Sequence, residues 1–282
     1  MDSALYTIFA AFSFATGACI ASFLNVVAWR LPRGESIVSP PSHCPKCNAP
    51  IRWWQNIPIL SWLALRGKCA KCREPISPRY IIVEAIGGAL FLAAFMRLLG
   101  NGNCSADELP VIITSLVAWW IWISLMIVGS VIDFDHKLLP DFTTVGGMVL
   151  GVVLNGINSL ILHSTFYILH SLSGLAFGFG LLWLIRWLGT KAFKREAMGM
   201  GDVFLMGAIG AMFGPVAVLV SLILSSLFGS AIGVTAMLFS KGRLGRFAEI
   251  PYGPYICLGC LVWMFYGPEL ITWYLRLLGF QA

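Results

Sequence analysis

Charged side chains are scarce in this sequence: they make up 11% of its 282 residues, against about 25% in a typical soluble domain. Apolar residues make up 58%, and the mean hydropathy is +0.82. A disordered chain needs low hydrophobicity and high net charge, so that class is excluded. Eight cysteines in 282 residues are too dilute for a secreted disulfide scaffold. The remaining class is an all-α polytopic membrane protein.

Eight apolar runs are candidate membrane-spanning helices, which need roughly 20 mostly apolar residues. The first, from Leu5 to Trp29, has no basic segment before it and is too long for a cleaved signal peptide. The sixth is short and ends at Gly214-Pro215, so we expect it to be tilted, kinked or incompletely spanning, which makes seven spans the alternative. After the first, the runs are 80–99, 110–132, 142–162, 170–188, 203–214, 216–239 and 255–275.

The basic residues predict the orientation, because Lys and Arg concentrate in cytoplasmic loops. With eight spans and the 30–79 loop in the cytoplasm, 17 of the 19 basic residues lie on the cytoplasmic side. Nine of these are in the 30–79 loop, and Lys241, Arg243 and Arg246 are in a later one. The N-terminus is then outside, and a basic surface facing anionic lipid explains the net charge of +6 without a nucleic-acid partner.

Two C-x2-C pairs, Cys44/Cys47 and Cys69/Cys72, lie in the 30–79 loop and are separated by 21 residues. Four thiolates presented in pairs can close a tetrahedral shell around Zn²⁺. Disulfides and redox-active thiols are the alternatives, and a reducing cytoplasm disfavours disulfides. Because an all-cysteine site has no open coordination position, we expect a structural zinc that folds this loop.

The remaining cysteines and one histidine near the pairs are weaker candidates for metal ligands. Cys257 and Cys260 also read C-x2-C but lie inside an apolar run, where we expect packing roles, as for Cys19 and Cys104. With four cysteines available, we expect His43 to be a bystander.

Acidic residues gather where two predicted spans meet the cytoplasmic face. Asp133, Asp135 and Asp141 follow the third span, and Asp202 closes the sequence GMGD at 199–202. Two opposed carboxylates suit aspartyl proteolysis, in which one takes a proton from water while the other, protonated, polarises the scissile carbonyl. The spacing alone does not choose among Asp133, Asp135 and Asp141 as the partner of Asp202.

Three other interpretations of these acidic residues remain open. Asp202 and Asp141 can be helix N-terminal carboxylates stabilised by the macrodipole. A proton- or cation-coupled transporter also uses membrane carboxylates, although it predicts them near the middle of the bilayer. A zinc-stabilised scaffold without chemistry predicts that Asn at Asp133 and Asp202 is silent.

Ordered motifs along nearly the whole chain resemble one family, the type IV prepilin peptidases, which are bifunctional leader peptidase/N-methyltransferases of pilus assembly and type II secretion. The motifs are GACIASFLNVV at 17–27, RLP at 30–32, SHCPKC at 42–47, NIPILSW at 56–62, RGKC at 66–69, ISPRY at 76–80 with Glu84, DFDHKLLPD at 133–141, GMGD at 199–202 and IPYGPY at 250–255.

The resemblance implies an aspartyl protease of the G-x-G-D class with Asp133 and Asp202 as its catalytic residues. Asp135, Asp141, Gly199 and Gly201 then have supporting roles. The implied reaction is cleavage of a short basic prepilin or pseudopilin leader after Gly, at the cytoplasmic face of the bacterial inner membrane. Methylation of the new N-terminus, usually a Phe, with S-adenosylmethionine follows.

The methyltransferase half has no glycine-rich cofactor motif, so it is implied by the resemblance alone. The polar candidates for it are Asn25, Arg30, Asn56, Arg79 and Glu84. We expect a first helix at 1–29, a methyltransferase-associated zinc loop at 30–79 and the protease helices at 80–282. Phe204 stands two residues after Asp202, where the family often has a Lys.

Overall fold

The computed structural model describes residues 3–100, 109–196, 198–239 and 251–279. Within these ranges the chain is helical and contains no β-strand, which confirms the all-α class. The elements are α1 (Ser3–Arg30), η1 (Leu31–Arg33), η2 (Trp53–Asn56), α2 (Leu60–Ala64), α3 (Arg79–Leu99), α4 (Leu109–His136), α5 (Asp141–Ile161), α6 (Phe166–Phe193), α7 (Met200–Phe213), α8 (Pro215–Phe239) and α9 (Gly253–Leu277).

Each of the eight predicted apolar runs coincides with one helix. Seven of these helices are long and apolar enough to cross a membrane. The exception is α7, whose 14 residues cover only about 21 Å of a hydrocarbon core about 30 Å thick. Cys104 and the loop residues Lys241, Arg243 and Arg246 lie outside the described residues.

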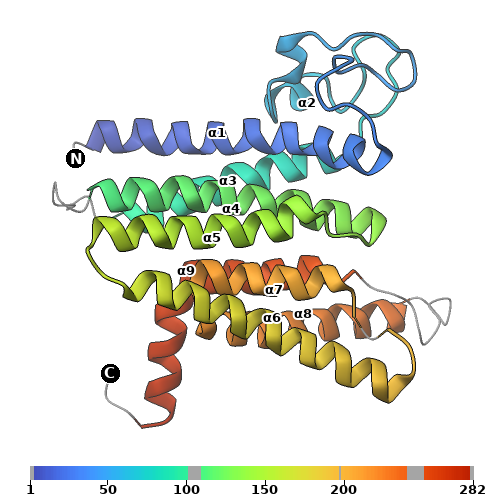
Figure 1. Ribbon diagram of the computed structural model, residues 1–282. Coiled ribbons are helices and arrows are strands. Elements are labelled where there is room, and N and C mark those ends of the chain that lie inside the picture. Colours follow the sequence, from blue (N-terminus) through green and yellow to red (C-terminus); the bar gives the residue numbers. More distant parts are fainter. Residues whose placement is uncertain (1–2, 101–108, 197, 240–250, 280–282) are drawn as a thin grey trace. The chain divides into compact units, whose positions relative to one another are not determined.

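The chain divides into two compact units, Met1–Val131 and Ile132–Ala282. In the first unit α1 and α3 run antiparallel along each other (Figure 1). A Cβ on Gly17 of α1 would lie 2.5 Å from the Gly87 carbonyl oxygen of α3. The two backbones are therefore in direct contact, which is how small residues let helices associate in lipid.

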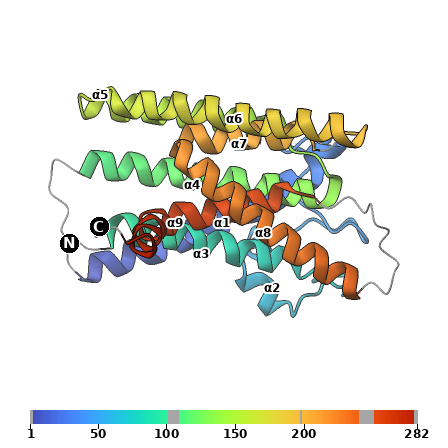
Figure 2. The ribbon, with the colours of Figure 1, turned by 90° about the horizontal axis from the view of Figure 1, so that it is seen from below.

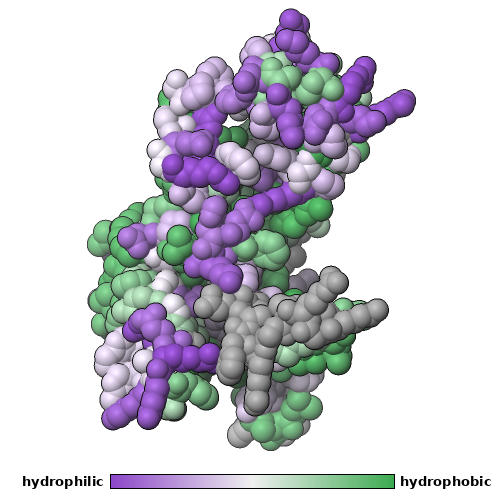
Figure 3. Space-filling model, turned by 90° about the vertical axis from the view of Figure 1, so that its right-hand side faces the viewer, coloured by the Kyte–Doolittle hydropathy of each residue, from purple (hydrophilic) through white to green (hydrophobic). Residues whose placement is uncertain are grey.

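The 31–78 loop of the same unit is its polar part and follows directly on α1. In the upper part of Figure 3 its surface is mainly hydrophilic. Below it, the helices carry many exposed apolar side chains, such as Phe12 and Phe23 of α1. Such side chains suit a surface that faces lipid rather than water.

In the second unit α7 is the central helix, and its residues 203–212 are buried almost throughout. It lies beside α5 and α6 (Figure 2). A Cβ on Gly174 of α6 would lie 2.1 Å from the Gly210 carbonyl oxygen, and one on Gly151 of α5 would lie 2.7 Å from the Ala211 backbone. Because α7 is surrounded by protein, its sequence is apolar all round rather than on one face.

Side chains from α5 and α6 satisfy the carbonyl groups at the end of α7. The Asn155 Nδ2 donates to the Ala211 oxygen at 3.1 Å and to the Met212 oxygen at 3.3 Å. The Ser171 Oγ donates to the Ala211 oxygen at 2.6 Å. Since the last four carbonyls of a helix have no intrahelical partner and lipid offers none, these bonds fix the end of α7.

We expect Gly174→Ala to destabilise the second unit by about 1–3 kcal/mol, because its Cβ would overlap the backbone of α7. The matched control is Gly180→Ala on the same helix, where an added Cβ meets nothing within 4 Å. The measurement is the thermal unfolding midpoint of each purified variant in detergent. Equal midpoints for the two variants would contradict the direct contact between α6 and α7.

Candidate active site and metal centre

Asp133 lies on the last turn of α4 and is 6% exposed. A carboxylate near a helix C-terminus is disfavoured by the macrodipole, so this position needs a compensating partner. The backbone N–H of Gly253 supplies one, because it donates to the Asp133 Oδ2 at 2.9 Å. Gly253 is the first residue of α9, whose N-terminus therefore points at the carboxylate.

The Gly253 backbone is held in this position by α8. The Tyr252 hydroxyl lies 2.9 Å from the Ser225 Oγ and 3.1 Å from the Ser226 Oγ, both of α8. A Cβ on Gly253 would lie 2.7 Å from the Asp133 Oδ2. Only glycine allows this close approach of backbone to carboxylate without displacement.

Asp202 lies in the first turn of α7, after the N-cap residue Gly199, and is half-buried. Leu139 joins it to the Asp133 region: its side chain would lie 2.9 Å from a Cβ on Gly201 and 3.1 Å from one on Gly253. Asp133 is close enough to Asp202 for the two charges to interact. The structure thus brings together two carboxylates and the N-termini of α7 and α9.

The segment before α7 is fixed by Arg186 of α6. The Arg186 Nε donates to the Met198 oxygen at 3.0 Å, and its Nη2 donates to the Glu196 Oε1 at 3.0 Å. These bonds fix Glu196 and Met198, which come just before Gly199, the N-cap residue of α7. Neither the motifs nor the charge pattern marks Arg186, Leu139 or Gly253 as residues that shape the site.

Two of the predicted supporting residues, Asp135 and Asp141, are exposed, whereas Asp133 is buried. Asp141 is in the first turn of α5, where the helix dipole favours a carboxylate. A Cβ on Gly199 would lie 3.6 Å from the Asp202 Oδ2. Phe204 packs against Phe179 of α6, with ring centroids 5.7 Å apart.

The four cysteines of the 31–78 loop form one cluster in which all four sulfur atoms lie within 4.8 Å of one another. The Cys44 and Cys72 sulfurs are 3.8 Å apart. Zn–S bonds of about 2.3 Å in a tetrahedral site place the sulfurs about 3.8 Å apart. The cluster therefore has the ligands and the spacing of a structural zinc site.

The two halves of the cluster repeat one backbone arrangement. Cys44 N–H donates to the Ala49 oxygen at 3.0 Å, and Cys69 N–H donates to the Glu74 oxygen at 2.8 Å. In the first half, Asn48 has a φ of 52°, and in the second, Arg73 has a φ of 63°. The sequence alone showed the paired cysteines but no repeat of this length.

Backbone N–H groups in each half also favour thiolates. Those of Cys72 and Lys71 lower the pKa of Cys69 to about 6. Those of Cys47 and Lys46 lower the pKa of Cys44. The Glu74 N–H lowers the pKa of Cys72, but burial and the other thiols outweigh it and raise that pKa to about 12. A dication at the centre would compensate the repulsion among the thiolates.

Two of the five candidates for methyl transfer, Arg30 and Asn56, line one cavity beside α1. The other three do not line it. Glu84 of α3 is buried, and its Oε2 accepts the Ile59 N–H at 2.8 Å. The Asn25 side chain is buried, and its Nδ2 finds no hydrogen-bond partner among the described residues. The Arg79 Nη2 donates to the Val131 oxygen at 3.5 Å.

These features define a polytopic helical membrane protein with an aspartate pair at adjoining helix ends and a four-cysteine loop. Two family models match it: the bacterial peptidase A24 N-terminal domain over residues 15–98, and the type IV leader peptidase family over residues 120–234. The chain belongs to the type IV leader peptidase family. The resemblance inferred from the motifs is thereby confirmed, and the transporter alternative is not supported.

Curated relatives match over most of the chain. A prepilin leader peptidase/N-methyltransferase of Myxococcus xanthus is 37% identical over 94% of this chain and 75% of its own length. One of Xanthomonas campestris is 34% identical over 94% of both chains. A type 4 prepilin-like proteins leader peptide-processing enzyme of Escherichia coli is 34% identical over 86% of this chain and 88% of its own length. No solved structure matches the chain significantly.

Proposed function

We propose that the protein cleaves the basic leaders of type IV prepilins or pseudopilins after Gly and then methylates the new N-terminal residue. The observation that carries the peptidase part is the Asp133–Asp202 pair, brought together from α4 and α7 beside the N-terminus of α9. Its setting in a chain whose relatives are named leader peptidases supports the choice of substrate.

In the proposed hydrolysis one carboxylate of the pair takes a proton from water, which attacks the carbonyl carbon of the scissile bond. The other carboxylate, protonated, donates a hydrogen bond to the carbonyl oxygen and later a proton to the leaving amine. The Gly253 N–H donates to the Asp133 Oδ2 and so orients this carboxylate, with its other oxygen left to accept a proton from water. We therefore assign the base to Asp133 and the acid to Asp202.

The proposed site lies at the cytoplasmic face of the bacterial inner membrane, with the N-terminus outside. The support is the placement of 17 of the 19 basic residues on one side of the predicted helices. A basic leader stays in the cytoplasm by the same rule, so its scissile bond meets the end of the membrane at which the aspartates lie.

Methyl transfer is proposed for the first unit, which holds the zinc-binding loop. When bound, S-adenosylmethionine supplies a sulfonium methyl group, which the unprotonated N-terminal amine accepts as the S–CH₃ bond breaks and one proton leaves the amine for water. Cys44, Cys47, Cys69 and Cys72 would hold a structural zinc that keeps the loop folded.

The test is incubation of the purified protein in detergent with a synthetic prepilin-type substrate, followed by mass spectrometry. We expect loss of the leader and, with S-adenosylmethionine present, a product heavier by one methyl group. Absence of cleavage would refute the function. Cleavage without methyl incorporation would reduce the protein to a peptidase.

We expect Gly253→Ala to lower the leader cleavage rate about 100-fold, the scale on which small misplacements of catalytic groups act. The new Cβ would lie 2.7 Å from the Asp133 Oδ2 and 3.1 Å from the Leu139 Cδ2, so it must displace the carboxylate. Gly146→Ala on α5 is the matched control, because its Cβ meets nothing within 4 Å. The measurement is the initial cleavage rate at saturating substrate, and equal rates for the two variants would exclude the Gly253 contact from catalysis.

A further inference from the structure

A cavity of about 330 Å³ lies in the first unit, between the C-terminal half of α1 and the loop that follows it. Its volume is in the range of about 300–1,000 Å³ that is typical of small-molecule sites. Cys19, Ser22, Phe23, Val26 and Arg30 of α1 form one wall, because they recur at helical spacing on one face. The segments 37–42 and 56–58 form the other.

Arg30 is the charged residue of this cavity and is only 8% exposed. Its Nη1 donates to the Ser36 oxygen at 3.0 Å, and among the described residues no carboxylate pairs with it. A guanidinium has five N–H donors, so most of its hydrogen-bonding capacity is directed elsewhere. Because a buried charge without a counter-ion is costly, a cavity beside it points to an anionic ligand group.

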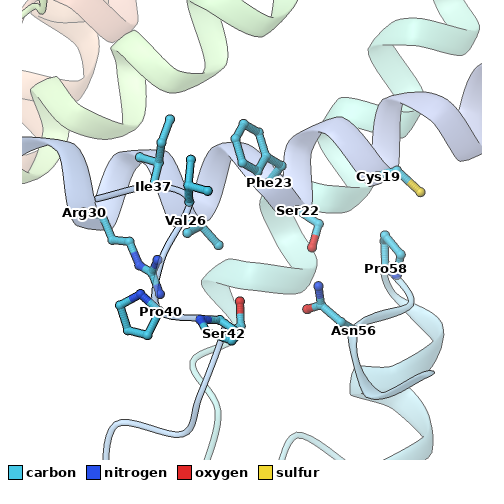
Figure 4. Close-up of a pocket in the computed structure, with 12 residues that line it drawn as sticks. Cys19, Ser22, Phe23, Val26, Arg30, Ile37, Pro40, Ser42, Asn56 and Pro58 are labelled. Atoms are coloured by element: carbon cyan, nitrogen blue, oxygen red, sulfur yellow. The ribbon is translucent and has the colours of Figure 1, made fainter. Parts of the chain in front are cut away.

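The rest of the lining fits a ligand that is polar at some edges and apolar on its faces. Figure 4 shows Ser22, Ser42 and Asn56 with their polar atoms directed into the space between α1 and the loop. Phe23, Val26 and Ile37 also line the cavity and supply its apolar surface. Hydroxyl and amide groups of this kind bind ribose hydroxyls and adenine edges, and the apolar side chains suit the face of a base.

The loop wall of the cavity is held in place from both ends. The Ser36 Oγ accepts the N–H groups of Val38 and Ser39, each at 3.3 Å, while its carbonyl binds Arg30. On the other side Ile59 has a left-handed φ of 64°, which is strained for a β-branched residue. The buried Glu84 accepts its N–H and thereby fixes the neighbouring Asn56–Pro58 segment.

We infer that this cavity binds S-adenosylmethionine, with the Arg30 guanidinium pairing with the α-carboxylate of its methionine end. This inference rests on the methyl transfer proposed above and assigns it a site. A single guanidinium matches a carboxylate in a bidentate geometry. Phe23 offers an aromatic face to the cationic sulfonium.

The test is equilibrium dialysis of labelled S-adenosylmethionine against the purified full-length protein in detergent. We expect Arg30→Gln to raise the Kd about tenfold or more, since a charge-assisted hydrogen bond is lost. The matched control is Arg33→Gln, one helical turn further on, whose guanidinium is exposed and lies 3.7 Å from the Trp29 ring centroid. The control should bind like the original protein.

A ligand lacking the carboxylate tests the pairing itself. The original protein should bind S-adenosylmethionine at least about tenfold more tightly than its decarboxylated form, and Arg30→Gln should remove this preference. A preference that persists in Arg30→Gln would place the carboxylate elsewhere. A variant that loses a co-purified phospholipid but keeps its affinity for S-adenosylmethionine would make the cavity a lipid site and overturn the inference.

A second variant covers the case in which Arg30→Gln fails to fold. Ser22→Leu fills the cavity from α1 without touching the Arg30–Ser36 bond, and we expect it to abolish measurable binding. Ala15→Leu is its control, because Ala15 does not line the cavity. If Ser22→Leu binds like Ala15→Leu while the protein still methylates its product, the site is wrong and the proposed function stands. If the original protein does not methylate at all, the proposed function fails first.

Discussion

Asp133→Asn and Asp202→Asn should each abolish leader cleavage, with a rate loss of about 100- to 10,000-fold, the range for removal of a general acid or base. The expectation follows from the position of the two carboxylates at adjoining helix ends and from the Gly253 N–H that donates to Asp133. The measurement is single-turnover cleavage of a prepilin-type substrate by purified variants of equal thermal stability.

Asp141→Asn is the matched control for both substitutions. Its carboxylate is exposed in the first turn of α5, so we expect only the small stability change of a lost dipole interaction, about 0.3–1 kcal/mol. Full activity in either Asp133→Asn or Asp202→Asn would refute the dyad. A rate loss in Asp141→Asn as large as theirs would show that the wrong carboxylate has been assigned.

Cys44→Ser should abolish zinc binding at the site that we propose for the four cysteines and, with it, methyl transfer. Zinc binding to an all-cysteine site contributes about 10–16 kcal/mol to the folding of small loops, so the 31–78 segment depends on it. Cys44 follows Ser42 of the cavity wall by two residues, and the Ser42 oxygen accepts the Ile51 N–H at 2.9 Å. Loss of the metal therefore loosens the wall that we assign to S-adenosylmethionine.

Metal analysis and the methylation assay measure the two parts of this prediction separately. Cys19→Ser is the control for zinc content alone, because Cys19 stands apart from the four-cysteine cluster but lines the cavity assigned to S-adenosylmethionine. Cleavage should survive better than methylation in Cys44→Ser, since Asp133 and Asp202 belong to the second unit. An unchanged zinc content in Cys44→Ser would refute the four-thiolate shell.

The helices of this protein were predictable from its sequence because lipid leaves few options. A backbone in the bilayer must satisfy its own hydrogen bonds, so an apolar run of sufficient length is a helix. All eight predicted runs are helices, and the short one, at 203–214, is short for the reason visible in the sequence: Gly214-Pro215 separates it from α8.

The site was predictable in part. The motifs predicted Asp133 and Asp202 as a pair, and both lie at adjoining helix ends in the second unit. The cysteine spacing predicted the cluster that Cys44, Cys47, Cys69 and Cys72 form. The Gly253 contact to Asp133 joins residues 120 positions apart, and no local pattern encodes such a distance. Leu139 lies between Gly201 and Gly253 as an ordinary apolar residue, so nothing in its type marks it. Arg30 and Asn56 entered as two of five polar candidates, and only the folded loop separates them from Asn25, Arg79 and Glu84.

The short length of α7 bears on how a hydrolase can work inside a membrane. Peptide hydrolysis consumes a water molecule, and acyl chains exclude water from the bilayer interior. The 14 residues of α7 leave about 9 Å of the roughly 30 Å hydrocarbon thickness uncovered. The carbonyls at the far end of α7 have partners in Asn155 and Ser171 and so tolerate a setting without water. We therefore expect the uncovered distance at the Asp202 end, with Asp202 within reach of both the bulk solvent and a peptide still anchored in lipid.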